Sequence, residues 1–109
     1  MRRFILVLLM ASFGATASIA VEQEVSVFES QGCSVCHKPE AFGTFPSLKE
    51  IAQGYQGKED HLINYFKGEA QPIVQPARAS MMKGYIEKTK ALSDADRKAL
   101  ADSIMSYSK

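Results

Sequence analysis

Residues 33–37 of this 109-residue chain read Cys33-Ser34-Val35-Cys36-His37, and this stretch decides how the surrounding sequence is organised. The spacing C-x-x-C-H is typical of covalent attachment of a c-type haem. Two thiols can add to the two vinyl groups of one porphyrin, and the adjacent imidazole can bind the iron as its proximal ligand. If Cys33 begins a helical turn, His37 lies four residues later on the same face, with Cys36 beside it. One short turn can therefore present all three groups to a single haem.

Three other interpretations of the two cysteines are open, and each lacks a feature that it requires. A disulfide redox pair normally sits in a βαβ pattern, which the flanking sequence does not show. A zinc site needs four ligands, and although the chain has two Cys and two His, His61 lacks a second ligand at the usual spacing. The third is an ordinary structural disulfide. The histidine directly after Cys36 favours haem attachment over all three.

The N-terminus has the three-part layout of a secretory signal peptide. Arg2 and Arg3 precede an apolar run that continues to about Phe13, and small residues follow as far as Ala20. We predict a signal peptide over residues 1–20, cleaved after Ala20 or, as the alternative, after Ala17, and a periplasmic mature protein. The apolar segment 4–20 lies at the lower edge of what crosses a bilayer, so a membrane is expected only if the segment stays uncleaved.

The remaining residues 21–109 are enough for one small domain and no more. Removing Arg2 and Arg3 from the 13 basic residues leaves 11, against 12 acidic residues. A mature chain so close to neutrality gives no reason to expect a nucleic-acid partner.

Beyond the motif the sequence predicts an all-α fold, because no useful β-alternation occurs in the mature chain. A first helix is expected to end at Gly32, just before Cys33. Capping signals and apolar stripes predict later helices over 48–53, 59–67 and 93–107, with Leu100, Ile104 and Tyr107 inward on the last. Residues 69–80 are predicted to be an extended loop, and His61 a solvated surface residue.

A histidine-ligated haem iron has one further axial position, and methionine sulfur is a soft ligand that favours Fe(II). Met81 and Met82 follow the proline-containing stretch 69–80, well downstream of the haem motif. A strap at this point could cross the far face of a porphyrin. Met105 lies within the last predicted helix, where packing explains it better.

The order of these features resembles the small bacterial class I cytochromes c. The resemblance covers nearly all of residues 22–108 and is carried by the stretches 32–37, 45–48 and 92–94, with a methionine before the last of them. It implies three to five short helices around one covalently bound haem, a monohaem domain over 21–109. It further implies that Cys33 and Cys36 hold the haem, that His37 is the proximal ligand and that the Pro46 carbonyl accepts a hydrogen bond from it. Met82 fits the family's axial methionine better than Met81, which stays the alternative.

The function that follows is a periplasmic one-electron carrier between redox proteins, not an enzyme in itself. The alternative is a haem-bearing electron-transfer subunit of an oxidoreductase complex. A ligand-binding or peroxidase-like protein is a third class, without positive support in the sequence. A local excess of positive charge predicts a docking patch for acidic partners at four residues: Arg78, Lys83, Lys88 and Lys90.

Overall fold

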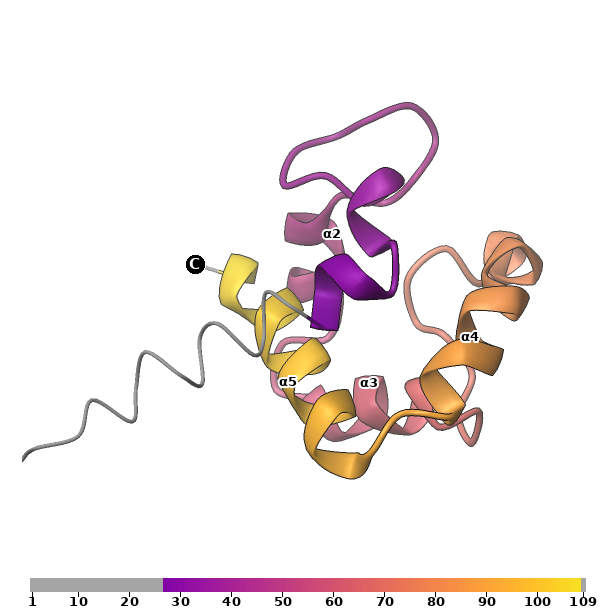
Figure 1. The fold of residues 1–109 in the computed structure, drawn as a ribbon. Helices are drawn as coiled ribbons and strands as arrows, with labels where there is room; N and C mark the ends of the chain where they lie inside the picture. Colours follow the sequence, from indigo (N-terminus) through magenta and orange to yellow (C-terminus); the bar gives the residue numbers. More distant parts are fainter. Residues whose placement is uncertain (1–26, 109) are drawn as a thin grey trace, which may run out of the picture.

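The computed structural model describes residues 27–108, and within this range the protein is built from helices and connecting turns (Figure 1). Residues 27–30 are helical, as expected for the end of the first helix. The α-helices that follow are α2 (Leu48–Gly54), α3 (Glu59–Phe66), α4 (Lys83–Lys90) and α5 (Asp94–Met105). Three 3₁₀ helices complete the order: η1 (Cys33–Val35), η2 (Pro76–Met82) and η3 (Ser106–Ser108). The predicted signal peptide and the opening turns of the first helix lie outside the described residues.

Helix α5 is the element against which α2 and α3 pack. Both α2 and α3 contact it, and the segment that ends the first helix lies beside it (Figure 1). Leu100 and Ile104 are buried on its inner face as predicted, whereas Tyr107 is 37% exposed and does not continue the stripe. The reason is that α5 ends at Met105 and gives way to η3, so the helical period that would turn Tyr107 inward is lost.

Serine caps begin two of the helices at the positions that the sequence indicated. The Oγ atom of Ser47 accepts a hydrogen bond from the Glu50 backbone N–H at 3.0 Å, and Ser93 does the same for Asp96 at 3.1 Å. Each cap satisfies a backbone donor that has no partner inside its own helix. These caps fix where α2 and α5 begin, and with them the face that each helix turns to the core.

The segment between α3 and α5 differs from the prediction of an extended loop over 69–80. Residues 76–80 belong to η2, and α4 follows it directly. Pro76 stands at the start of η2, where its fixed backbone angle is compatible with a helical turn and its missing N–H leaves nothing unpaired. The helix α4 escaped prediction because Thr89 is its one buried residue, so it has no apolar stripe. We call residues 76–90 the strap.

Buried polar groups, rather than apolar packing, anchor the strap at its C-terminal end. The Thr89 hydroxyl donates to the Phe66 carbonyl of α3 at 2.8 Å. Arg97 is a buried residue, and its guanidinium donates to the carbonyls of Thr89 at 3.3 Å, of Lys90 at 3.1 Å and of Leu92. A guanidinium at the end of α4 satisfies carbonyls that the helix leaves open and complements its negative end. The anchor therefore ties α4 to both α3 and α5.

Among the residues that the structure describes, no helix is both long and apolar enough to cross a membrane.

Candidate haem site

The haem-attachment motif forms one tight turn at the end of the first helix. Gly32 adopts the left-handed conformation (φ 75°), which ends the helix and redirects the chain into η1. The backbone N–H groups of Cys36 and His37 both donate to the Cys33 carbonyl, at 3.3 and 2.9 Å. This closes the i to i+4 turn that the spacing predicted. Both cysteines are free thiols and half-buried, whereas Val35 between them is 67% exposed.

The first motif thiol, Cys33, lies where its ionised form is disfavoured. Burial raises the pKa of the Cys33 thiol to about 11. A backbone hydrogen bond lowers this pKa by less, and Glu29 raises it and Lys88 lowers it by smaller amounts still. Thiol–disulfide exchange depends on the thiolate, and a pKa this high keeps Cys33 protonated at neutral pH. Cys33 is therefore a poor attacking thiol for disulfide exchange at neutral pH.

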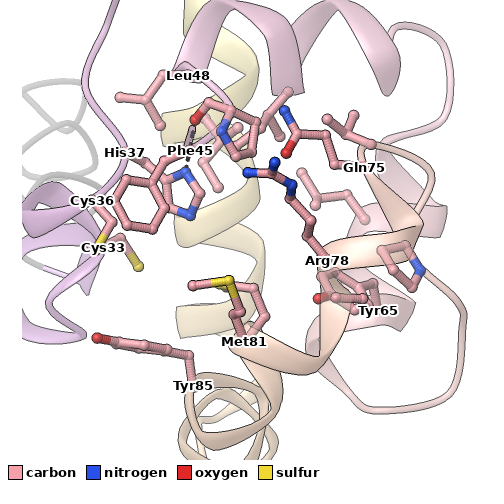
Figure 2. Close-up of a pocket in the computed structure, with 18 of the residues that line it drawn as sticks. Cys33, Cys36, His37, Phe45, Leu48, Tyr65, Gln75, Arg78, Met81 and Tyr85 are labelled. Carbon is pink, nitrogen blue, oxygen red and sulfur yellow. Dashed lines mark hydrogen bonds between the residues drawn. The ribbon is translucent and has the colours of Figure 1, made fainter. Parts of the chain in front are cut away.

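The imidazole of His37 is oriented by a backbone carbonyl. Its Nδ1 lies 2.8 Å from the Pro46 oxygen, which is the hydrogen bond expected from the resemblance (Figure 2). Nδ1–H donates to this carbonyl, so the second nitrogen, Nε2, carries the lone pair and is free to bind a metal. The turn that delivers Pro46 closes through a bridge between Phe42 and Phe45, and the Leu48 N–H donates to the Lys38 carbonyl at 2.8 Å.

A cavity of about 290 Å³ opens beside the motif turn and is lined almost entirely by apolar and aromatic side chains. Core side chains line its inner end, and the strap lines the side that faces the motif turn (Figure 2). Met81 and Met82 both line this wall. Figure 2 places Met81 across the cavity from His37; its side chain is 63% exposed, whereas Met82 is half-buried.

The residues present fit a covalently attached haem. Two thiols and an imidazole with a free nitrogen lie on one turn, and methionine sulfurs line the wall across the cavity. A porphyrin is a large apolar disc, and the lining of aromatic and aliphatic side chains is what such a disc requires. Cysteine thiols for covalent attachment, and an imidazole and a methionine thioether as iron ligands, are the groups that a c-type haem requires.

Several wall residues were not singled out from the sequence. Tyr65, Val74, Gln75 and Tyr85 line the cavity, and Arg78, expected only as a docking residue, also does. Nothing in their local sequence marks them, because α3, the strap and the loop before it meet at the cavity only through tertiary packing. His61 is partly exposed, its Nε2 donates to the Gln71 carbonyl at 2.8 Å, and its ring contacts Tyr55. It therefore lies partly at the surface, and its ring nitrogen is bonded to the loop that precedes the strap.

An all-helical fold that closes around a haem-attachment turn defines a c-type haem protein. Residues 25–108 match the family model described as Cytochrome c, and the chain belongs to this family. The fold is accordingly that of a class I cytochrome c, and haem-based electron transfer is the activity that the family implies. No curated protein matches the chain closely.

Proposed function

We propose that the protein is a periplasmic one-electron carrier of bacterial origin with histidine and methionine as axial ligands. The observation that carries the proposal is the arrangement of one cavity, with His37 on one wall and the methionine pair of the strap on the other. The bound haem supplies the one-electron Fe(III)/Fe(II) couple. The chain itself holds that group through Cys33 and Cys36, orients the proximal imidazole and excludes water from the apolar cavity.

Of the two methionines, Met82 is the proposed axial ligand and Met81 the alternative. Both line the cavity, but Met81 is 63% exposed, whereas Met82 is withdrawn further from solvent. A thioether that must compete with water for the iron is better placed in the drier position. The family resemblance points to the same residue.

Spectroscopy of two variants tests this assignment. We expect Met82→Ala to lose the far-red absorption band of the Met–Fe(III) bond, and Met81→Ala to retain it. Loss of the band in Met81→Ala alone would transfer the role to Met81. Retention in both variants would contradict methionine ligation, and carbon monoxide binding to the reduced parent protein would favour a ligand-binding haem protein instead.

We further propose that the strap is the docking surface for an acidic redox partner. Arg78, Lys83, Lys88 and Lys90 are all exposed, and Met81 between them offers an exposed apolar contact. The charge of Lys90 is partly neutralised by Glu87, whose Oε1 lies 3.4 Å from the Lys90 Nζ, and the Lys88 Nζ lies over the Tyr85 ring. A positive surface beside the cavity raises the encounter rate with negatively charged partners and leaves binding weak enough for turnover.

The docking proposal is tested through the salt dependence of electron transfer. Reversing the charge at Lys83 and Lys88 should slow transfer to an acidic acceptor protein and flatten its dependence on ionic strength. The matched control is Lys58→Glu, an exposed cation outside the cavity lining. Equal effects in the strap variant and the control would remove the docking surface.

Whether the carrier acts alone or as a subunit of an oxidoreductase complex is decided by its state in periplasmic extracts. A free carrier should elute as a monomer after release of the periplasm, with an N-terminus at Val21. Stable co-purification with a catalytic subunit would favour the complex, and retention in the membrane fraction would indicate an uncleaved anchor.

A further inference from the structure

Helix α4 connects the proposed axial methionine to a buried polar anchor. Met82 directly precedes the first turn of α4, and Thr89 and Lys90 lie in its last turn. The helix has eight residues and, at 1.5 Å per residue, is about 12 Å long. Over so short a length an α-helix moves as one rigid element. A displacement of its C-terminal end therefore also moves the methionine at its N-terminal end.

The C-terminal end of α4 is held by its contacts with α3. Thr89 is the one buried residue of α4, and the others are half-buried or exposed. The Thr89 hydroxyl donates to the carbonyl of Phe66, the last residue of α3, at 2.8 Å. A Cβ on Gly68 would lie 2.9 Å from the Lys90 Cδ, so the aliphatic part of Lys90 lies against the turn that ends α3. The position of α4 thus depends on this end more than on an apolar face.

Arg97 completes the anchor from a place where a positive charge is unfavourable by itself. It is buried near the N-terminal end of α5, where the helix dipole is positive. Its Nη1 donates to the Thr89 and Lys90 carbonyls at the negative end of α4, at 3.3 and 3.1 Å. Its Nε is buried without a hydrogen-bond partner among the described residues. A buried charge that is incompletely paired adds little stability, but it can specify one arrangement of the groups that it bonds.

We propose that Arg97 is a positioning residue for the axial methionine. By fixing the C-terminal end of α4 it holds the sulfur of Met82 in the cavity, opposite His37. The inference rests on the proposed methionine ligation. Asp94 acts through Arg97, because its exposed carboxylate accepts from Nη2 and orients the guanidinium toward α4. Without Arg97 the strap should move away from the cavity more often while the rest of the protein stays folded.

Binding of imidazole to the ferric holoprotein measures how often the strap opens. Imidazole can bind the iron only after methionine has left it, so at high imidazole concentration the observed rate reaches a limit set by strap opening. We expect Arg97→Gln to raise this limiting rate about tenfold or more, because hydrogen bonds from a charged donor to α4 are lost. Arg97→Lys retains the charge and should raise the rate less.

Two milder variants test the route through the anchor. Asp94→Asn should raise the limiting rate severalfold in the parent, but should not change it further in the Arg97→Gln background, because Asp94 acts through the arginine. Thr89→Val keeps the size of the side chain and removes the hydroxyl that donates to Phe66. It should also raise the rate. Both variants keep Arg97 in place, so they test the anchor even if Arg97→Gln does not fold.

A substitution outside the strap separates positioning from general stability. Ala52→Gly, at a buried position of α2, should lower the unfolding temperature but leave the limiting imidazole rate near that of the parent. Hydrogen exchange of the α4 amides should accelerate in Arg97→Gln and not in Ala52→Gly.

The inference is overturned if Arg97→Gln and Asp94→Asn keep the Met–Fe(III) band and bind imidazole at the parental limiting rate. It is also overturned if Ala52→Gly accelerates binding as much as they do, because strap opening would then follow general stability. A parent protein that lacks the Met–Fe(III) band would instead overturn the proposed ligation on which the inference rests.

Discussion

The imidazole of His37 is held by a main-chain oxygen, so no single side-chain replacement removes its partner. The acceptor is the Pro46 carbonyl, and the next residue, Ser47, is buried and caps α2. The orientation of the proximal ring thus depends on where α2 begins. A sequence change that shifts this helix start would act on the iron ligand from a distance.

Glu59 and Asp102 form a carboxyl pair between the first turn of α3 and α5. A side-chain hydrogen bond with Asp102, together with burial and the negative charge of Asp102, raises the pKa of Glu59 to about 7. Burial works against ionisation of Asp102, but hydrogen bonds from Glu59 and Lys98 lower its pKa overall. The shared proton therefore resides on Glu59.

This pair predicts a dependence of stability on pH. Unfolded Glu59 releases its proton near pH 4.5, whereas the folded protein retains it to about pH 7. The stabilisation is complete below the lower value and is lost as the pH rises through the upper one. The thermal unfolding temperature of the parent should therefore fall between pH 5 and pH 8 relative to that of Glu59→Gln, whose amide cannot ionise. Glu69→Gln, at an exposed position, is the control; a parent that parallels Glu59→Gln across this range would contradict the shared proton.

At the scale of the elements, two glycines make opposite predictions. A Cβ on Gly54 at the end of α2 would lie 2.5 Å from the Val74 Cγ2, whereas one on Gly84 in α4 would meet no atom within 4 Å. Gly54→Ala should lower the free energy of unfolding by about 1–3 kcal/mol through overpacking. Gly84→Ala should raise it by about 0.5–1 kcal/mol through helix propensity.

Denaturant unfolding of the two variants measures both effects. Shortening Val74 to alanine in the Gly54→Ala background should recover part of the loss, because the clash lies with that side chain. If Gly54→Ala leaves the free energy of unfolding unchanged, this result would contradict the close approach of Val74 to the end of α2.

The helices that could be predicted from the sequence are those whose local signals agree with their packing. α2 and α5 have serine caps, and α3 has acids in its first turn and a buried pair, Leu62 and Phe66. α4 could not be predicted because it has a glycine in its first turn and one buried residue, and its anchor, Arg97, lies on another helix. Helices held by distant polar contacts leave no periodic trace in their own sequence.

At the scale of the whole molecule, the haem cavity and the hydrophobic core are one structure. Buried core side chains also line the cavity, and they come from the first helix, α2, the turn after it, α3 and α5: Phe28, Leu48, Tyr55, Leu62, Phe66 and Ile104. A domain of this size buries little apolar surface, so these side chains, if they faced water, would remove a large part of its hydrophobic stabilisation.

We therefore expect the Cys33→Ala/Cys36→Ala protein, which cannot retain haem covalently, to unfold at a much lower temperature and less cooperatively than the holoprotein. Val35→Ala, an exposed change within the same motif, should leave the transition unchanged. Calorimetry of the purified proteins makes the comparison. A cooperative transition at the holoprotein temperature would show that the core is complete without the cofactor.

The residues of the candidate site also differ in whether local sequence or distant packing determines their position. Cys33, Cys36 and His37 could be assigned from the sequence because one turn carries all of them. Gln75 could not, because it reaches the cavity only through the packing of segments that are distant in the sequence.

The turn closed by Phe42 and Phe45 also indicates where this chain tolerates a change in length. Residues 38–44 are exposed, and extra residues there would extend into solvent at an entropic cost that grows slowly with loop length. The loop before the strap is different, since Tyr55 accepts from Ile73 N–H at 3.0 Å and His61 donates to Gln71. Insertions and deletions among relatives should accordingly occur in residues 38–44 and be rare in the loop before the strap. A reporter peptide is therefore best inserted within residues 38–44.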